Sequence, residues 1–186
     1  MSYRGADWLE RADRDTREQP EHVLDVIHIT EGTFVVVLGA GTGYFTLRLA
    51  HRVGPTGVVL ATDLQPEMLE MLGRRVADSG TTNIRPVLAT PDDAKLPLGR
   101  VDLVMMVDVY HELPNPRGPL AQIRAALRPD GRVALVEYRE EDPEVAIKPE
   151  HKMTLAQIRK ELEGAGLVFV SSDESLPDQR IVVFRR

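Results

Sequence analysis

The hydrophobic positions of this chain form short, nearly unbroken apolar runs that are separated by amphipathic segments. The clearest runs occupy residues 34–38, 58–62 and 101–107, and an amphipathic segment follows the first of them over 44–52. Unbroken apolar runs of this length are typical of parallel strands buried on both faces, whereas amphipathic segments are typical of helices that cover such a sheet. The pattern therefore predicts an α/β fold with a central parallel sheet.

Turn and capping signals place the remaining elements. Pro20 begins a helix at a position where proline is tolerated, and Thr154 with Gln157 forms a capping box at the start of another. A further amphipathic helix is expected over residues 117–128. Additional strands are predicted over residues 84–89, 132–138, 167–171 and 181–184.

The segment before Pro20 differs from the rest of the chain because it is mostly charged. Over residues 6–18 only Trp8, Leu9 and Ala12 are clearly apolar, which predicts a solvent-exposed helix that packs through Trp8 on the outside of the domain. A length of 186 residues suits one domain with a full core, so we expect a single domain over 1–186. Its N-terminal helices occupy 1–29 and its core 30–186.

Composition and charge exclude several classes of function. The net charge is −6, which argues against a nucleic acid partner because affinity for phosphate backbones comes mainly from clustered Lys and Arg. The chain has no cysteine, so it has no disulfide, no thiolate metal site and no cysteine nucleophile. No apolar run approaches the length of a membrane span and no signal-peptide pattern is present, so a cytoplasmic protein without a membrane partner is expected.

Three glycines at alternate positions directly follow the first apolar run. Glycine at 39, 41 and 43 lets the backbone turn sharply and removes the β-carbons that would hold a ligand away from the main chain. A ligand is therefore expected against this loop. The G-x-G-x-x-G pattern of dinucleotide folds requires a glycine where Tyr44 stands, so the spacing disfavours a nicotinamide-dependent oxidoreductase.

The G-x-G-x-G loop resembles the first motif of class I S-adenosylmethionine (SAM) dependent methyltransferases, and later segments match the family in order. These are Asp63 with Met68-Leu69, Asp92-Asp93 with Leu96-Pro97, 101–104 with His111, and Pro129-Asp130-Gly131 with Glu137. The resemblance covers roughly residues 30–186 and is to the small-molecule, type 11 group related to quinone-biosynthesis enzymes. It implies a Rossmann-like doubly wound seven-stranded sheet of order 3-2-1-4-5-7-6, with the last strand antiparallel. It also implies SAM as methyl donor, S-adenosylhomocysteine as product and a small-molecule acceptor.

The resemblance assigns cofactor contacts to the loops that follow the first four strands. In the family the glycine loop lies beneath the amino-acid part and ribose of SAM, the acid after the second strand binds both ribose hydroxyls, and an acid after the third strand binds the adenine amino group. The corresponding residues are Gly39, Ala40, Gly41, Gly43, Asp63, Leu64, Asp92 or Asp93, Val107 and Asp108. The register from Pro97 favours Asp92. The structural alternatives are a helix N-cap at Asp63 and a plain turn with two solvated acids at 92 and 93.

Transfer of a methyl group from a sulfonium requires an in-line approach of the acceptor, and a phenol or hydroxyl acceptor also needs a base. His111 is the preferred candidate base because imidazole titrates near neutral pH, with Asp108 or Glu112 as its orienting carboxylate. His151 is the alternative base. The competing interpretation is a structural histidine at 111 that is bonded to a strand-end carbonyl.

The acceptor pocket is expected where the fourth and fifth strands end, because the carboxyl ends of parallel strands share one edge of the sheet. Its candidate residues are Tyr110, Glu112, Glu137 and Tyr138. Methyltransferases of this class often close their pocket with N-terminal helices. If residues 6–18 form such a lid, Tyr3 and Trp8 contact the substrate.

One departure from the family pattern keeps other functions open. An acid usually stands two places before the first glycine, and here that place is Val37. The alternative to an enzyme is therefore a non-catalytic SAM-binding or interaction protein, with a nicotinamide-dependent oxidoreductase less favoured. A metal site is not predicted, because the spacing of His111, Glu112, Glu137 and His151 matches no compact metal motif. The identity of the acceptor and the oligomeric state depend on loops and surfaces that these patterns leave open.

Overall fold

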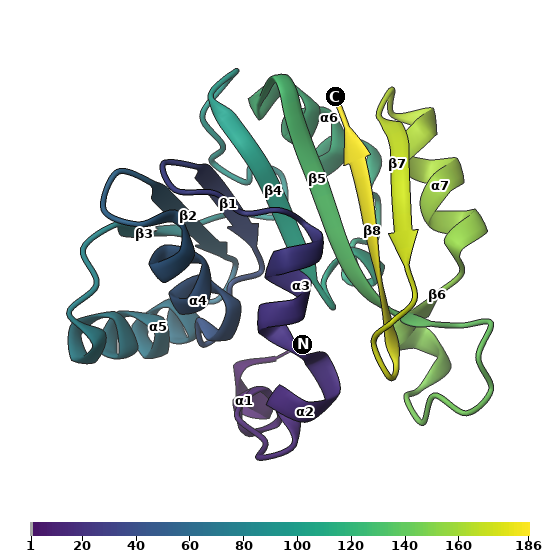
Figure 1. Ribbon diagram of the computed structural model, residues 1–186, viewed down its shortest axis with the longest axis horizontal. Helices are drawn as coiled ribbons and strands as arrows, with labels where there is room; N and C mark the ends of the chain where they lie inside the picture. Colours follow the sequence, from purple (N-terminus) through teal and green to yellow (C-terminus); the bar gives the residue numbers. More distant parts are fainter. Residues whose placement is uncertain (1) are drawn as a thin grey trace.

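A computed structural model describes residues 2–186, which are arranged as a twisted mixed sheet with helices on both faces (Figure 1). The sheet has the order β3-β2-β1-β4-β5-β8-β7, and the two-residue strand β6 pairs with β5. The strands are β1 Phe34–Leu38, β2 Val58–Asp63, β3 Ile84–Leu88, β4 Val101–Val107, β5 Leu127–Arg139, β6 Lys152–Met153, β7 Val168–Asp173 and β8 Gln179–Arg185.

Strand directions confirm the predicted fold class. The pairs of β1 with β2 and β4, of β2 with β3, and of β4 with β5 are all parallel, whereas β8 is antiparallel to both β5 and β7. If the short β6 is left out of the numbering, the order is the predicted 3-2-1-4-5-7-6 with the last strand antiparallel. The topology reverses between β1 and β4, which is where open α/β sheets place ligands.

Helices occupy the segments between the strands. They are α1 Ala6–Leu9, α2 Arg14–Glu18, α3 Pro20–Val26, α4 Tyr44–Val53, α5 Pro66–Ser79, α6 Arg117–Ala126 and α7 Leu155–Gly164, with 3-10 turns η1 Tyr3–Gly5, η2 Tyr110–Glu112 and η3 Pro149–His151. The Thr154 half of the predicted capping box is present, because its hydroxyl accepts the Gln157 N–H at 3.0 Å, whereas the Gln157 side chain donates to Glu161 at 3.1 Å. Among residues 2–186, no helix is both long and apolar enough to cross a bilayer.

Alternate residues of the central strands face two separate hydrophobic layers. In β1, Val35 and Val37 pack in a cluster with residues of α3, α4 and α5, whereas Val36 packs with residues of α6 and α7. Each of these valines is almost fully buried, which stabilises the fold by about 1.5–3 kcal/mol per side chain relative to exposure. Both faces of the sheet are therefore covered. The part that remains accessible to a ligand is the rim formed by the carboxyl ends of β1, β2, β4 and β5.

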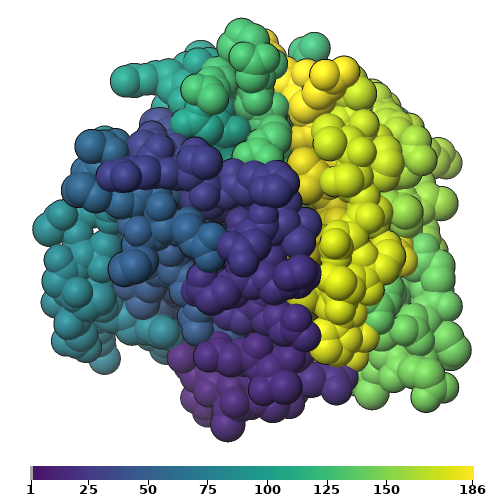
Figure 2. Space-filling model, viewed as in Figure 1, coloured from purple at the N-terminus to yellow at the C-terminus, as the bar shows by residue number. Residues whose placement is uncertain are grey.

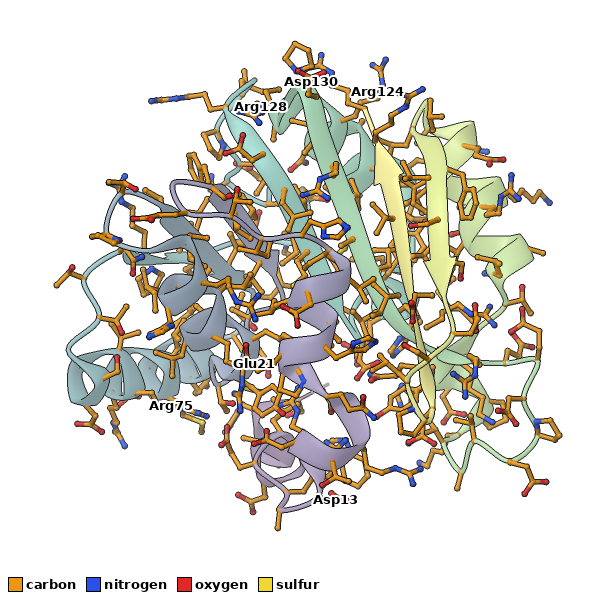
Figure 3. The ribbon with its side chains drawn as sticks, in the orientation of Figure 1. Asp13, Glu21, Arg75, Arg124, Arg128 and Asp130 are labelled. Carbon is orange, nitrogen blue, oxygen red and sulfur yellow. The ribbon has the colours of Figure 1, made fainter. Side chains whose placement is uncertain are left out.

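The N-terminal segment lies across this rim. In Figure 1, α1 and α2 lie at the end of the molecule toward which β4 and β5 run, and Figure 2 shows the N-terminal part of the chain beside its C-terminal part. Arg17 links the two parts through an ion pair with Asp178 at 2.5 Å. Figure 3 shows Asp13 at this end of the molecule and Asp130 at the opposite end. We call residues 2–18 the cap.

Two predicted helix boundaries are wrong. Residues 6–18 do not form one helix, because the carbonyl groups of Trp8 and Leu9 accept bonds from the guanidinium groups of Arg11 at 3.0 Å and Arg14 at 2.6 Å. The helix predicted over 117–128 ends at Ala126, since Leu127 is already extended and pairs with β4. Proline at 129 also disfavours a helical conformation at the residue before it.

Candidate active site

A cavity of about 860 Å³ opens at the rim between the sheet and the cap. Its walls come from the ends of β1, β2 and β4, from the loops that follow β3 and β5, and from the cap. Of the residues predicted as a site, those that line it are Trp8, Gly39, Gly41, Asp63, Leu64, Asp92, Val107, Asp108, His111, Glu112, Tyr138 and His151.

The residues of the glycine loop have two different roles at the cavity. Gly41 has a φ of 55° and lines the cavity, where its N–H points to a carboxylate. Gly43 has a φ of 93° and a β-carbon there would overlap Leu72 of α5, so this glycine fixes the start of α4 against α5. Ala40 donates its N–H to the Thr62 carbonyl at 2.9 Å. Gly43 and Ala40 therefore hold the loop in shape without lining the cavity.

Asp63 joins the end of β2 to the glycine loop. Its Oδ2 accepts the Gly41 N–H at 2.9 Å and its Oδ1 accepts the Gln65 N–H at 3.0 Å, and the residue is 8% exposed at the cavity wall. The N-cap of α5 is Gln65, so the alternative of a helix N-cap at Asp63 is wrong. Each carboxylate oxygen accepts one N–H and retains capacity to accept a second hydrogen bond.

The two acids after β3 have different surroundings. Asp92 lines the cavity, and its carbonyl accepts Gln122 Nε2 at 2.7 Å, which anchors the loop to α6. The Asp93 carboxylate accepts the side chain of Lys95 at 2.6 Å and its N–H at 2.8 Å. These bonds hold the pKa of the Asp93 carboxyl below its usual range. The residue favoured by register, Asp92, is therefore the one at the cavity.

Val37, which stands where the family usually has an acid, is buried in the hydrophobic core. A carboxylate from the cap lies at the cavity instead. Glu18 is 2% exposed, and its Oε1 accepts Arg14 Nε at 2.9 Å and Arg11 Nη2 at 2.8 Å. Its other oxygen, Oε2, has no hydrogen-bond partner among the described residues. All three side chains line the cavity, so a buried carboxylate oxygen is left for a ligand.

Asp108 lies at the end of β4 in a left-handed conformation with a φ of 52°. Both of its carboxylate oxygens accept Gln179 Nε2 from β8, at 2.9 and 2.8 Å. Burial raises the pKa of the Asp108 carboxyl well above its usual range, and the nearby charge of Glu137 raises it further. Asp108 is thus held by β8 and not by His111.

His111 is oriented by Glu137 and not by Asp108 or Glu112. Its Nδ1 lies 2.7 Å from Glu137 Oε2, while Glu137 Oε1 accepts the Tyr110 N–H at 2.8 Å. Glu137 is fully buried behind His111 and does not line the cavity. The interpretation of His111 as a histidine bonded to a carbonyl is therefore wrong, because its Nδ1 partner is a carboxylate.

The second ring nitrogen of His111 faces another histidine. His111 Nε2 lies 3.1 Å from His151 Nδ1, and the rings meet edge to face with centroids 5.1 Å apart. Among the described residues, the potential metal-ligating atoms of His111, His151 and Glu112 all lie within 4.8 Å of one another. Residues that are 40 positions apart in the chain therefore form one polar cluster at the cavity wall.

Besides Glu137, two further predicted pocket residues do not line the cavity. Tyr110 is buried in the hydrophobic layer beneath α6 and α7, where its hydroxyl donates to Glu161 at 2.7 Å, and burial raises the pKa of this phenol. Tyr3 does not line the cavity, although its N–H donates to the Gln65 side chain at 2.7 Å. Trp8 does line the cavity and is 50% exposed, which agrees with the alternative of a lid and not with a helix outside the domain.

Several cavity residues were missed by the sequence patterns. They include Leu9, Arg11, Arg14 and Glu18 of the cap, and Ile147 and Lys148 of the loop after β5. In the sequence, Trp8 was the one indication that the N-terminal segment could reach the site. The missed cap residues lie in the same segment and also line the cavity. No sequence signal marked the loop residues.

Residues 35–131, more than half of the chain, match the family model of the methyltransferase domain. A ubiquinone/menaquinone biosynthesis C-methyltransferase of Pseudomonas fluorescens is 27% identical over 116 residues, which are 62% of this chain and 45% of the relative. Nocamycin O-methyltransferase of Saccharothrix syringae is 29% identical over 122 residues, which are 64% and 42%. The chain spans less than half the length of these curated relatives.

Solved structures resemble the chain over nearly its whole length. A SAM dependent methyltransferase from Aquifex aeolicus has a TM-score of 0.93 and 25% identity, over 100% of this chain and 98% of that chain. A chain in the complex of a methyltransferase activator with a putative methyltransferase from Haloferax volcanii has a TM-score of 0.80 and 20% identity, over 98% and 96%. The second likeness concerns the fold alone.

Proposed function

The chain belongs to the methyltransferase domain family, as its motifs predict, and we propose that it transfers a methyl group from SAM to a small-molecule acceptor. The observation that carries this proposal is the Asp63 carboxylate, which is bonded to the glycine loop at the wall of a large cavity. The names of the curated relatives add that C- and O-methylation occur in this family.

The ribose and adenine of SAM are proposed to bind between β2 and the loop after β3. Asp63 offers one free lone pair on each carboxylate oxygen, which suits the two hydroxyls of a ribose. Leu64 and Asp92 lie further along the same wall, where an apolar side chain suits the adenine face and a carboxylate suits its amino group. We assign Val107 to the same side of the cavity.

The amino-acid end of SAM is proposed to bind beneath the cap. The unpartnered Oε2 of Glu18 is a fitting acceptor for the α-ammonium group, and the guanidinium groups of Arg11 and Arg14 are suitable donors to the α-carboxylate. Glu18 thereby replaces the family acid that is absent at Val37. This assignment makes the cap part of the binding site and argues against a mere surface role for it.

The acceptor is proposed to lie against His111, on the side of the cavity opposite to Asp63. Bound SAM supplies an electrophilic methyl carbon and a leaving group, so the protein has to position the acceptor and exclude water. Glu137 stabilises a proton on His111 Nδ1, which leaves Nε2 as the lone pair that takes the acceptor's proton. Tyr138 and the loop residue Ile147 provide further surface for an aromatic or apolar acceptor body.

The experiment that tests this proposal is transfer of a labelled methyl group from SAM over a panel of phenols, thiols and amines. We expect at least one acceptor to be labelled, with stoichiometric release of S-adenosylhomocysteine. His111→Gln should lower the rate by about 10²–10⁴-fold while affinity for S-adenosylhomocysteine stays the same. Binding without any transfer over the whole panel would favour a non-catalytic SAM-binding protein.

A further inference from the structure

We infer that His111, His151 and Glu112 form a binding site for a divalent transition-metal cation at the acceptor side of the cavity. The class of acceptor inferred from this site is a small molecule with two adjacent oxygen atoms, such as an ortho-dihydroxy aromatic. The acceptor class rests on the proposed methyl transfer, whereas the cation site itself does not.

The distances between the candidate ligand atoms suit a single cation. Two imidazole nitrogens on one such ion, each at about 2.0–2.1 Å from it, lie roughly 2.8–3.4 Å apart. His111 Nε2 and His151 Nδ1 lie 3.1 Å apart, and the ligand atoms of the two histidines and Glu112 are within 4.8 Å of one another. Glu112 is exposed and lines the same cavity as the two histidines.

Glu137 prepares His111 for a cation. A carboxylate at 2.7 Å from Nδ1 keeps the proton on that nitrogen, so the lone pair of the neutral ring is on Nε2, the atom that faces His151. Histidines that bind metals commonly donate their other N–H to a carboxylate in this way, which fixes the ring and increases its basicity. Glu137 is itself fixed by the Tyr110 N–H and is fully buried, so the arrangement is rigid.

The fold holds the three ligands in place from two directions. His111 and Glu112 belong to η2, directly after β4, and His151 ends η3, directly before β6. Strand β6 pairs with the end of β5 through Lys152 and Tyr138, next to Glu137. The loop after β5 therefore returns His151 to the same sheet edge that presents His111.

The ligand set indicates both the type of cation and its open positions. Two imidazoles and one carboxylate suit zinc, manganese, iron or cobalt, whereas calcium prefers oxygen ligands alone. Three protein ligands leave coordination positions for other groups, and His111, Glu112 and His151 all line the cavity. Two adjacent oxygens of an acceptor are a bidentate ligand for those positions.

The cation and the hydrogen bond between the histidines exclude one another, because both need the same two nitrogen atoms. In the loaded protein the cation takes over the activation assigned above to His111 Nε2. An acceptor hydroxyl binds the cation as an oxyanion and its proton passes to the buffer. The oxygen then bonds to the methyl carbon as the bond from that carbon to sulfur breaks, and S-adenosylhomocysteine leaves.

Titration of the full chain, stripped of metal with a chelator, with Co²⁺ and separately with Zn²⁺ tests the site. We expect one cation per chain by calorimetry, with visible absorption from Co²⁺ bound to imidazole. His151→Asn and Glu112→Gln should each weaken binding at least tenfold, and Glu137→Gln by about 10–100-fold. His51→Asn, which changes an exposed histidine of α4, should bind like the unaltered chain.

Calorimetry with S-adenosylhomocysteine on the same samples separates this inference from the proposed function. Variants that still bind S-adenosylhomocysteine are folded, so their loss of cation binding supports the site. Absence of cation binding by the unaltered chain, or equal binding by His151→Asn, overturns the inference and leaves the methyl-transfer proposal intact.

For the acceptor class, we expect ortho-dihydroxy compounds to be methylated faster than single phenols and the chelator to abolish the difference. An unchanged preference with chelator overturns that part.

Discussion

Single residues at the rim combine a structural and a chemical role. The Asp63 carboxylate holds the glycine loop through Gly41, lines the cavity and retains capacity to accept further hydrogen bonds. Glu137 likewise fixes the turn at Tyr110 and orients His111. Such residues could be predicted from their position near the end of a strand, but their partners could not. The partner of Asp108, for example, is Gln179 on the last strand, which no spacing near Asp108 indicates.

Replacing Gly43 by alanine tests the shape of the loop. We expect Gly43→Ala to lower the free energy of unfolding by about 2 kcal/mol or more, because its φ of 93° is strained for alanine and a β-carbon overlaps Leu72. Gly73→Ala is the matched control, since nothing lies within 4 Å of the added atom inside α5. That control should stabilise the protein by roughly 0.5–1 kcal/mol. Urea denaturation of both variants measures the difference, and equal effects would contradict the account.

Removing the charge of Asp108 tests the electrostatics of the rim. Because the pKa of this carboxyl is raised in the folded protein, its contribution to stability is present below pH ~4 and is lost as the pH rises toward the folded value. Asp108→Asn lacks this loss, and asparagine tolerates the φ of 52°. Its stability relative to the unaltered chain should therefore increase by about 1 kcal/mol or more between pH 4 and pH 8. A difference that does not change with pH, measured by urea denaturation, would refute the raised pKa.

At the scale of elements, the hydrophobic pattern predicts the sheet well and the cap poorly. The strands β1, β2 and β4 are apolar on both faces, so their burial and their order follow from local sequence. The cap is divided into α1 and α2 by side-chain bonds of Arg11 and Arg14 to backbone carbonyls, which periodicity does not register. A metal site at His111, Glu112 and His151 was considered and not predicted, because η2 and η3 are distant in sequence and their spacing matches no compact metal motif.

Glu10 links the cap to the glycine loop and to α5. Its replacement should therefore lower the local stability of the cap without affecting the sheet. Its carboxylate accepts the Thr42 hydroxyl of the glycine loop at 2.5 Å and forms an ion pair with Arg75 of α5. We expect Glu10→Ala to speed hydrogen exchange in residues 6–18 by roughly 2–10-fold, a loss of about 0.5–1.5 kcal/mol, with no change in β4 or β5. Asp7→Ala, an exposed residue of α1, is the control. Equal exchange in the two variants would mean that this contact does not hold the cap.

At the scale of the whole molecule, two hydrophobic layers leave one rim of the sheet for chemistry. Arg124, Arg128 and Asp130 lie at the other end of the molecule, far from the cap (Figure 3). The central claim is that the adenosyl group of the methyl donor binds at the cap end, between the glycine loop and Asp63. The roles proposed for Glu18, for His111 and for the cation site of His111, His151 and Glu112 all depend on the adenosyl group binding there.

Calorimetric titration with S-adenosylhomocysteine tests this claim most directly, on the unaltered chain, on Asp63→Ala and on Asp78→Ala, an exposed residue of α5. We predict saturable one-to-one binding by the unaltered chain and by Asp78→Ala. Asp63→Ala should bind at least roughly tenfold more weakly, because each lost hydrogen bond to a charged group is worth about 1.5–3 kcal/mol. No binding by the unaltered chain, or equal affinity in all three proteins, would contradict the account.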